Sequence, residues 1–171
     1  MTMTPRLRKF VLTAHVTFSV GWLGAVIAYL ALAVTGLTGQ DALKVRAVYL
    51  SMELIGRFVL VPCSLAALLT GLVQSLGTEW GLFRHYWIQV KFLLTLVGTL
   101  VLWVHMRAVS RMAGIAAETE WLMADSGMLR LQLVVHAAGG LLVLLIATVL
   151  SVYKPWGRTP HGLRQQSAPR P

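Results

Sequence analysis

The feature that most constrains this chain is a long stretch without charge near its beginning. No formally charged residue occurs between Val11 and Leu37. A transmembrane helix needs about 20 consecutive, mostly apolar residues, and this stretch exceeds that length. Three further long apolar stretches follow, so the sequence predicts four spanning segments, at about 10–36, 49–76, 86–109 and 131–153.

The overall composition agrees with a membrane protein. Of the 171 residues, 57% are apolar and 12% are charged, whereas a soluble domain has about 25% charged residues. A water-soluble enzyme and a disordered chain are therefore excluded, and the single cysteine, Cys63, excludes a disulfide scaffold. The usual phosphate-loop, zinc-protease and nucleophile-elbow motifs are missing from the sequence.

The expected fold is all-α, a four-helix transmembrane bundle. The apolar stretches are long and rich in leucine, without the alternation that marks strands. In lipid, a spanning helix also satisfies its own backbone hydrogen bonds. Residues 1–153 are expected to form this one domain, and residues 154–171 a disordered basic tail. The first stretch is longer than the apolar region of a signal peptide, so an uncleaved helix is expected.

Short polar links are expected between the helices, at Thr38–Val48, Gly77–Arg84 and Ser110–Arg130. Within the last link, Ala116–Trp121 is expected to form a short surface helix. Pro62 is expected to kink the second span, because proline lacks a backbone N–H.

The net charge of +9 has a topological interpretation, because the basic residues lie at the ends of the apolar stretches and form no nucleic-acid-binding stripe. Eight lysines and arginines fall on the side of the two termini, and five on the other side. The eight are Arg6, Arg8, Lys9, Arg84, Lys154, Arg158, Arg164 and Arg170, and the five are Lys44, Arg46, Arg107, Arg111 and Arg130. Since positive loops stay inside, both termini are expected to be cytoplasmic.

Ionisable residues inside the spans carry most of the functional information, because a charge at the centre of a span costs about 2.5–3.5 kcal/mol. Glu53 and Arg57 are four residues apart and can form an ion pair on one helix face. Alternatively, Arg57 faces the bundle interior and binds a propionate or another carboxylate.

The other ionisable residues fall at two depths. His15 and Lys91 form an expected inner layer, and His105 and His136 join Glu53 and Arg57 in an expected outer layer. Lys91 and His105 are 14 residues apart on one helix face, which corresponds to about 21 Å along the axis.

Three histidines from three spans, His15, His105 and His136, are candidate ligands for a metal. Imidazole is the usual axial ligand that a helical bundle offers to haem iron. His105 and His136 lie at one depth on consecutive spans, as a pair of ligands on one iron requires. The alternative is that each histidine only bonds a neighbouring carbonyl group.

Two segments resemble known families. The run from His15 through Trp22 to Gly24 is similar to the first helix of small bacterial membrane families with a His-x6-Trp-x-Gly pattern. These include the haem-binding membrane protoporphyrinogen oxidase and the copper-resistance D domain. Trp87 and Lys91, with His105 downstream, resemble the oxidase's third helix. This resemblance implies that His15 and Lys91 are linked to haem and activity.

Nearly all of residues 5–157 resembles a family of uncharacterised bacterial integral membrane proteins, a domain of unknown function. Trp80–Trp87 and Val152–Pro155 carry this likeness. His136 is not part of the oxidase signature, which favours a haem-binding relative with a different redox partner.

The leading hypothesis is therefore a haem b protein with an electron-transfer or porphyrin-handling role. His105 and His136 are expected to ligate an outer haem. His15 and Lys91 are expected to bind a porphyrin, haem or quinone, while Arg57 steadies an anionic edge. The expected partners are the lipid bilayer and a quinone or another membrane redox protein, without nucleic acid. Two alternatives stay open: a non-catalytic membrane subunit or solute carrier with structural histidines, and copper handling by the same histidines.

Overall fold

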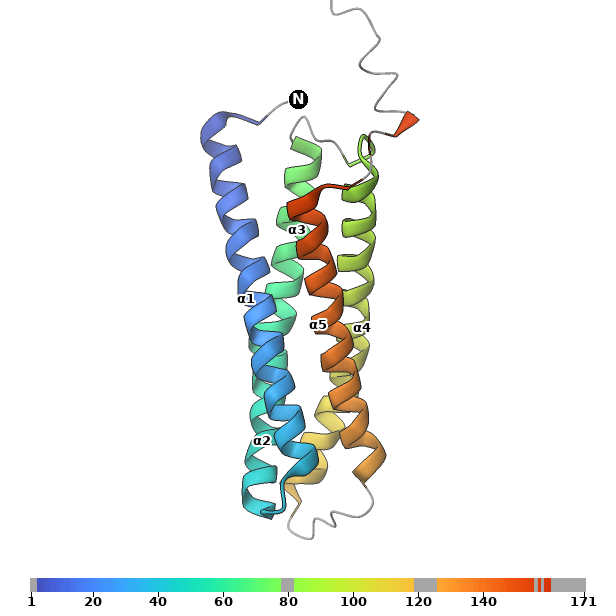
Figure 1. Ribbon diagram of the computed structural model, residues 1–171. Helices are drawn as coiled ribbons and strands as arrows, with labels where there is room; N and C mark the ends of the chain where they lie inside the picture. The colour runs from blue at the N-terminus through green and yellow to red at the C-terminus, as the bar shows by residue number, and fades with distance from the viewer. Residues whose placement is uncertain (1–2, 78–81, 119–125, 156, 158, 161–171) are drawn as a thin grey trace, which may run out of the picture.

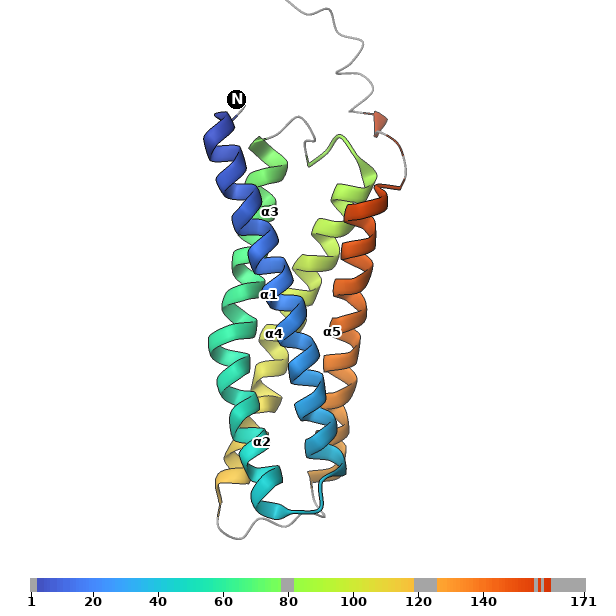
Figure 2. The same ribbon diagram turned by 60° about the vertical axis from the view of Figure 1, so that its left-hand side comes forward.

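The computed structural model describes residues 3–77, 82–118, 126–155, 157, 159 and 160. Its elements are α1 (Pro5–Thr38), α2 (Ala42–Ile55), η1 (Gly56–Leu60), α3 (Val61–Gly77), α4 (Tyr86–Ala117) and α5 (Gly127–Tyr153). In Figures 1 and 2, α2, η1 and α3 follow one another as a single rod. This rod packs with α1, α4 and α5 into a bundle in which consecutive rods run antiparallel. The start of α1 and the end of α5 lie at the same end of it.

The all-helical prediction is confirmed for the described residues, which contain no strand. Within the described ranges, four helices are long and apolar enough to cross a membrane: α1, the combined Ala42–Gly77 rod, α4 and α5. Large apolar side chains cover the outside of the bundle, among them Phe10 and Phe58, which are 72% and 69% exposed. An apolar exterior of this kind indicates a multi-pass membrane protein, because lipid is the solvent that accepts it.

The links between helices are shorter than predicted. The expected link over Thr38–Val48 is wrong, since α2 already begins at Ala42. Asp41 caps this helix by accepting hydrogen bonds from the backbone N–H groups of Leu43 and Lys44. Val45 is completely buried in the core. A strong N-terminal cap and a buried face therefore extend the helix beyond its lipid-spanning part.

The predicted link over Ser110–Arg130 is also wrong at its start, because α4 continues to Ala117. Met112 and Ala116 are fully buried there, and Arg46 donates a hydrogen bond to the carbonyl oxygen of Ala117 at 3.0 Å. Ala116 and Ala117, the first two residues of the expected surface helix, therefore belong to α4. Residues 119–121 of that prediction lie outside the described residues.

The second rod contains a π-helical turn just before Pro62. The backbone N–H of Val61 donates to the carbonyl oxygen of Gly56, five residues earlier. Proline has no N–H to donate and its ring crowds the carbonyl four residues before it, so the preceding turn widens. The structure thus shows a π turn before Pro62, and the predicted kink of the rod stays a prediction.

Close approach of α1 and α2 depends on Gly36. A Cβ atom at this position would lie 2.6 Å from Cζ of Tyr49. Tyr49 is 1% exposed and packs against the α1 backbone at this point. Any larger residue at position 36 would push the two helices apart.

Interior positions on α1 and α4 repeat every seven residues, or about two helical turns. The positions are His15, Trp22, Tyr29 and Gly36 on α1, and Lys91, Gly98, His105 and Met112 on α4. His15 contacts Lys91, 76 positions later, and Trp22 lies against Gly98 at the same offset. The two helices therefore run parallel in a fixed register, which brings Tyr29 level with His105.

The described part of the predicted tail returns to the bundle. Lys154 ends α5 in the left-handed conformation, with φ of 46°. Thr159 then donates its N–H to the carbonyl oxygen of Arg84 at 2.9 Å, and its hydroxyl to that of Phe83. Thr159 is thus held against the link before α4, and most of the predicted disordered tail lies outside the described residues.

Candidate functional site: two polar layers in the bundle

The inner layer forms around His15 of α1, as the sequence predicts. Its Nδ1 lies 3.1 Å from the carbonyl oxygen of Ala67 and 3.2 Å from Oγ1 of Thr70. Because a carbonyl group only accepts, the proton of the ring belongs on Nδ1. The other ring nitrogen, Nε2, lies 3.5 Å from Nζ of Lys91 on α4 and accepts from the amine. Three rods thus meet at one imidazole whose nitrogens both have partners.

The outer layer contains the outer histidine pair, His105 of α4 and His136 of α5. Their rings are stacked, with centroids 4.5 Å apart and an interplanar angle of 9°. His136 is half-buried, and its Nδ1 lies 2.9 Å from the carbonyl oxygen of Gln132. The prediction that these two histidines meet at one depth is confirmed.

His105 differs from His15 in its surroundings. The residue is 6% exposed, and neither of its ring nitrogens has a hydrogen-bond partner among the described residues. Burying a polar group without a partner costs free energy, and such groups in proteins usually have a water, an ion or a ligand as partner. Of the three candidate histidines, His105 is thus the one with both ring nitrogens available for a ligand.

As they are stacked, the two rings are not arranged as ligands of one metal ion. Two imidazoles on one metal point their nitrogens at each other across about 4 Å, twice a metal–nitrogen bond of about 2 Å. The stacked rings instead present their faces to each other. In the described parts of the chain, no three His, Cys, Asp or Glu side chains gather to hold a metal ion. His15 therefore does not share a metal with the outer pair.

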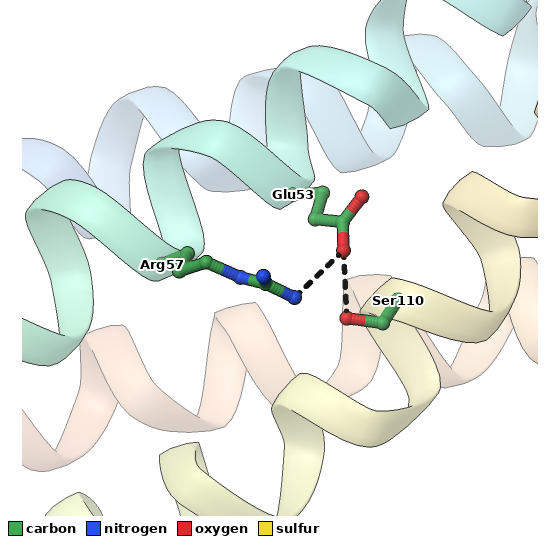
Figure 3. A network of polar contacts seen from close by, with 3 residues as sticks. All are labelled: Glu53, Arg57 and Ser110. Atoms are coloured by element: carbon green, nitrogen blue, oxygen red, sulfur yellow. Dashed lines mark hydrogen bonds and ion pairs between the residues drawn. The ribbon is translucent and has the colours of Figure 1, made fainter.

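Glu53 and Arg57 form the predicted ion pair, shown in Figure 3. Nη2 of Arg57 lies 3.1 Å from Oε1 of Glu53, and the hydroxyl of Ser110 on α4 donates to the same oxygen at 2.8 Å. The Arg57 side chain is 60% exposed. The expectation that Arg57 faces the bundle interior is wrong, because Gly56 and Leu60 take the buried positions of this turn.

Three polar groups in the core are missing from the sequence-based prediction. Arg130, counted there as a loop residue, is 7% exposed and places its guanidinium 5.8 Å from the centre of the Tyr49 ring. The hydroxyl groups of Tyr29 and Tyr49 are buried and have no hydrogen-bond partner within the described parts of the chain. The seven-residue spacing from His15 through Trp22 identifies Tyr29, whereas nothing in the sequence pairs Arg130 with Tyr49.

No protein-family model, no curated protein and no solved structure matches this chain. The likeness to the haem-binding and copper-resistance families therefore stays a resemblance of short motifs. The functional argument accordingly depends on the geometry of the two layers.

Proposed function

We propose that this chain is a multi-pass protein of the bacterial inner membrane that binds haem b at the outer histidine pair and has a redox role. The single observation that carries the proposal is the buried His105 ring, whose two nitrogens have no partner among the described residues. The ring of His136 on α5 is stacked against it and supplies a second imidazole. The termini are proposed to be cytoplasmic, which places this pair in the outer half of the bilayer.

The hydrogen bond of His136 prepares it as a ligand. A histidine that binds a metal usually donates its other N–H to a carbonyl or carboxylate, which fixes the ring orientation and tautomer. Nδ1 of His136 lies 2.9 Å from the carbonyl oxygen of Gln132, so its proton is on Nδ1 and its lone pair on Nε2. His105 offers a nitrogen at the same depth.

The two imidazoles supply the donor atoms that haem iron takes, and the stacked rings have to separate before a macrocycle can enter between them. With centroids 4.5 Å apart, the rings are already in contact. Binding therefore requires one ring to rotate and α4 to part from α5 at this level. On α5, a Cβ atom added at Gly139 or Gly140 would meet nothing within 4 Å, so this helix is unobstructed beside His136. Haem b, when bound, supplies one-electron chemistry.

The inner layer is proposed to bind a quinone or porphyrin and to handle its proton. Lys91 is a hydrogen-bond donor inside a span, a position that usually marks a functional site. The lone pair on Nε2 of His15 can take up a proton from Lys91 or from a bound quinol, while the Nδ1–H stays donated to the Ala67 carbonyl. The register of α1 and α4 separates this layer from His105 by 14 residues, or about 21 Å.

The test is a reduced-minus-oxidised absorbance spectrum of the full chain purified in mild detergent. We expect a low-spin b-type spectrum in the unmodified protein. His105→Ala and His136→Ala should each abolish or change it, and His85→Ala, a histidine before α4, should preserve it. An unaltered low-spin spectrum in both variants overturns the proposed ligation, and a colourless unmodified protein overturns haem binding.

Copper handling is the second candidate, because a single ion needs less room than a macrocycle. If the ring of His105 or of His136 rotates, one of its nitrogens can point at a copper ion beside the pair, without separation of the two helices. Copper titration of haem-free protein, followed by absorbance, separates the two candidates. If His105→Ala and His136→Ala only lower stability and no chromophore is ever bound, the histidines have a structural role in a non-catalytic membrane protein.

A further inference from the structure

An open cavity of about 340 Å³ lies on the outer surface between the second rod and α4. Its lining residues are Arg57, Val61, Trp103, Met106, Arg107 and Ser110. Two of these six residues are arginines, from η1 and from α4, and both are exposed. They belong to different rods, so the cavity has a positive group from each side.

The charged lining residues, Arg57 and Arg107, together with Glu53 carry an excess of one positive charge. Arg57 is paired with Glu53, whose Oε1 also accepts a hydrogen bond from Ser110 (Figure 3). Arg107 makes no ion pair with any described acidic residue. One singly charged anion therefore balances the group formed by Glu53, Arg57 and Arg107.

The depth of the two arginines corresponds to the edge of a bilayer. The stacked rings of His105 and His136 mark one level of the bundle. From His136, α5 continues without charge to Tyr153, 17 residues later, which corresponds to about 26 Å. Arg107 lies two residues beyond His105 on α4, so its level is close to the end of a hydrocarbon layer about 30 Å thick.

The lining also changes from polar to apolar along the helix axis. Trp103 lies one turn before Arg107 on α4, towards the middle of the span, and is 59% exposed. Val61 lies one turn after Arg57, in the same direction. Ser110 lies on the opposite side of the arginines, away from the middle of the span. This order is that of a phospholipid, with its headgroup at the surface and its acyl chain inward.

We propose that this cavity binds the headgroup phosphate of an anionic phospholipid, with an acyl chain against Val61 and Trp103. Guanidinium groups match phosphate oxygens with paired hydrogen bonds, and weak hydration suits them to the edge of a membrane. Phosphatidylglycerol carries the single negative charge that balances the excess positive charge. Its headgroup and acyl chains also follow the polar-to-apolar order of the lining residues. This site is independent of the outer histidine pair.

Native mass spectrometry of the detergent-solubilised full chain tests the proposal. The probes are phosphatidylglycerol, phosphatidylcholine with the same acyl chains, and inorganic phosphate. We expect the protein to retain phosphatidylglycerol in preference to the other two probes. In Arg107→Gln the affinity for phosphatidylglycerol should fall by about tenfold, because one charge-assisted hydrogen-bonding group is lost. Arg111→Gln is the matched control, because Arg111 is exposed one turn further along α4 and does not line the cavity.

Glu53→Gln provides a test with the opposite sign, which a misfolded variant cannot imitate. Removing the carboxylate frees Arg57 and raises the excess charge, so phosphatidylglycerol should bind several-fold more tightly. Equal binding of the two lipids, full binding by Arg107→Gln, or no gain in Glu53→Gln overturns the proposal. Inorganic phosphate bound as well as phosphatidylglycerol overturns the lipid as occupant.

Discussion

The inner and outer layers place the same side chain, histidine, in two contrasting environments. His15 has partners at both nitrogens, from the α3 backbone and from Lys91. His105 is more deeply buried, and its nitrogens have none among the described residues. A buried imidazole with partners at both nitrogens stabilises the contacts between helices by itself. A buried imidazole without partners costs free energy until a water, an ion or a ligand bonds to it. The contrast separates a layer whose imidazole already has a partner at each nitrogen from a layer whose imidazole has none among the described residues.

The largest expected effect is on the bound chromophore. His105→Ala should abolish low-spin haem binding, whereas His15→Ala should leave the outer centre in place, because the two layers are about 21 Å apart. Absorbance per mole of purified protein measures this. Equal losses in the two variants would remove the distinction between the layers.

The next effect is on the stability of the inner layer. His15→Leu removes the partner of Lys91 and leaves a half-buried amine without its acceptor, which costs about 1–3 kcal/mol. For a chain of this size the expected fall in Tm is about 2–4 °C for each kcal/mol. Thermal unfolding in detergent measures it, with Lys91→Met and the double variant completing the cycle. Additive effects of the two substitutions would contradict the contact.

A smaller effect of opposite sign is expected in the outer layer. In haem-free protein, His105→Leu replaces a buried ring without hydrogen bonds by an apolar side chain, which should raise Tm by about 2–4 °C for about 1 kcal/mol. In the presence of haem the order should reverse, because the unmodified protein is stabilised by bound haem and His105→Leu does not bind it. A fall in Tm of the haem-free protein would mean that His105 has a structural partner.

The smallest effect is expected at Tyr29, level with His105. Its buried hydroxyl bonds to none of the residues that the structure describes, so Tyr29→Phe should change the free energy of unfolding by less than about 0.5 kcal/mol. A matched Thr70→Val substitution removes a hydroxyl that donates to Ala66 and should cost more. A large loss in Tyr29→Phe would indicate that the phenol has a partner, such as a water or a ligand in the outer layer.

The sequence predicts the spans and the depths of their polar residues, because the bilayer sets helix length and the helical rise sets depth. His15 with Lys91 and His105 with His136 are found together for this reason. It does not decide which way Arg57 faces, because both an ion pair with Glu53 and an interior position are compatible with the sequence, and only the burial of Gly56 and Leu60 separates them. It also places helix ends at charged residues, although the cap at Asp41 and buried side chains such as Met112 extend α2 and α4.

Low-temperature electron paramagnetic resonance of the oxidised protein tests the central claim most directly, because it reports the ligands of the metal itself. The account predicts a low-spin ferric signal typical of two imidazole ligands, which disappears in His105→Ala and in His136→Ala. A copper signal, or no metal signal in protein purified with its membrane lipids, would contradict haem ligation by the outer histidine pair.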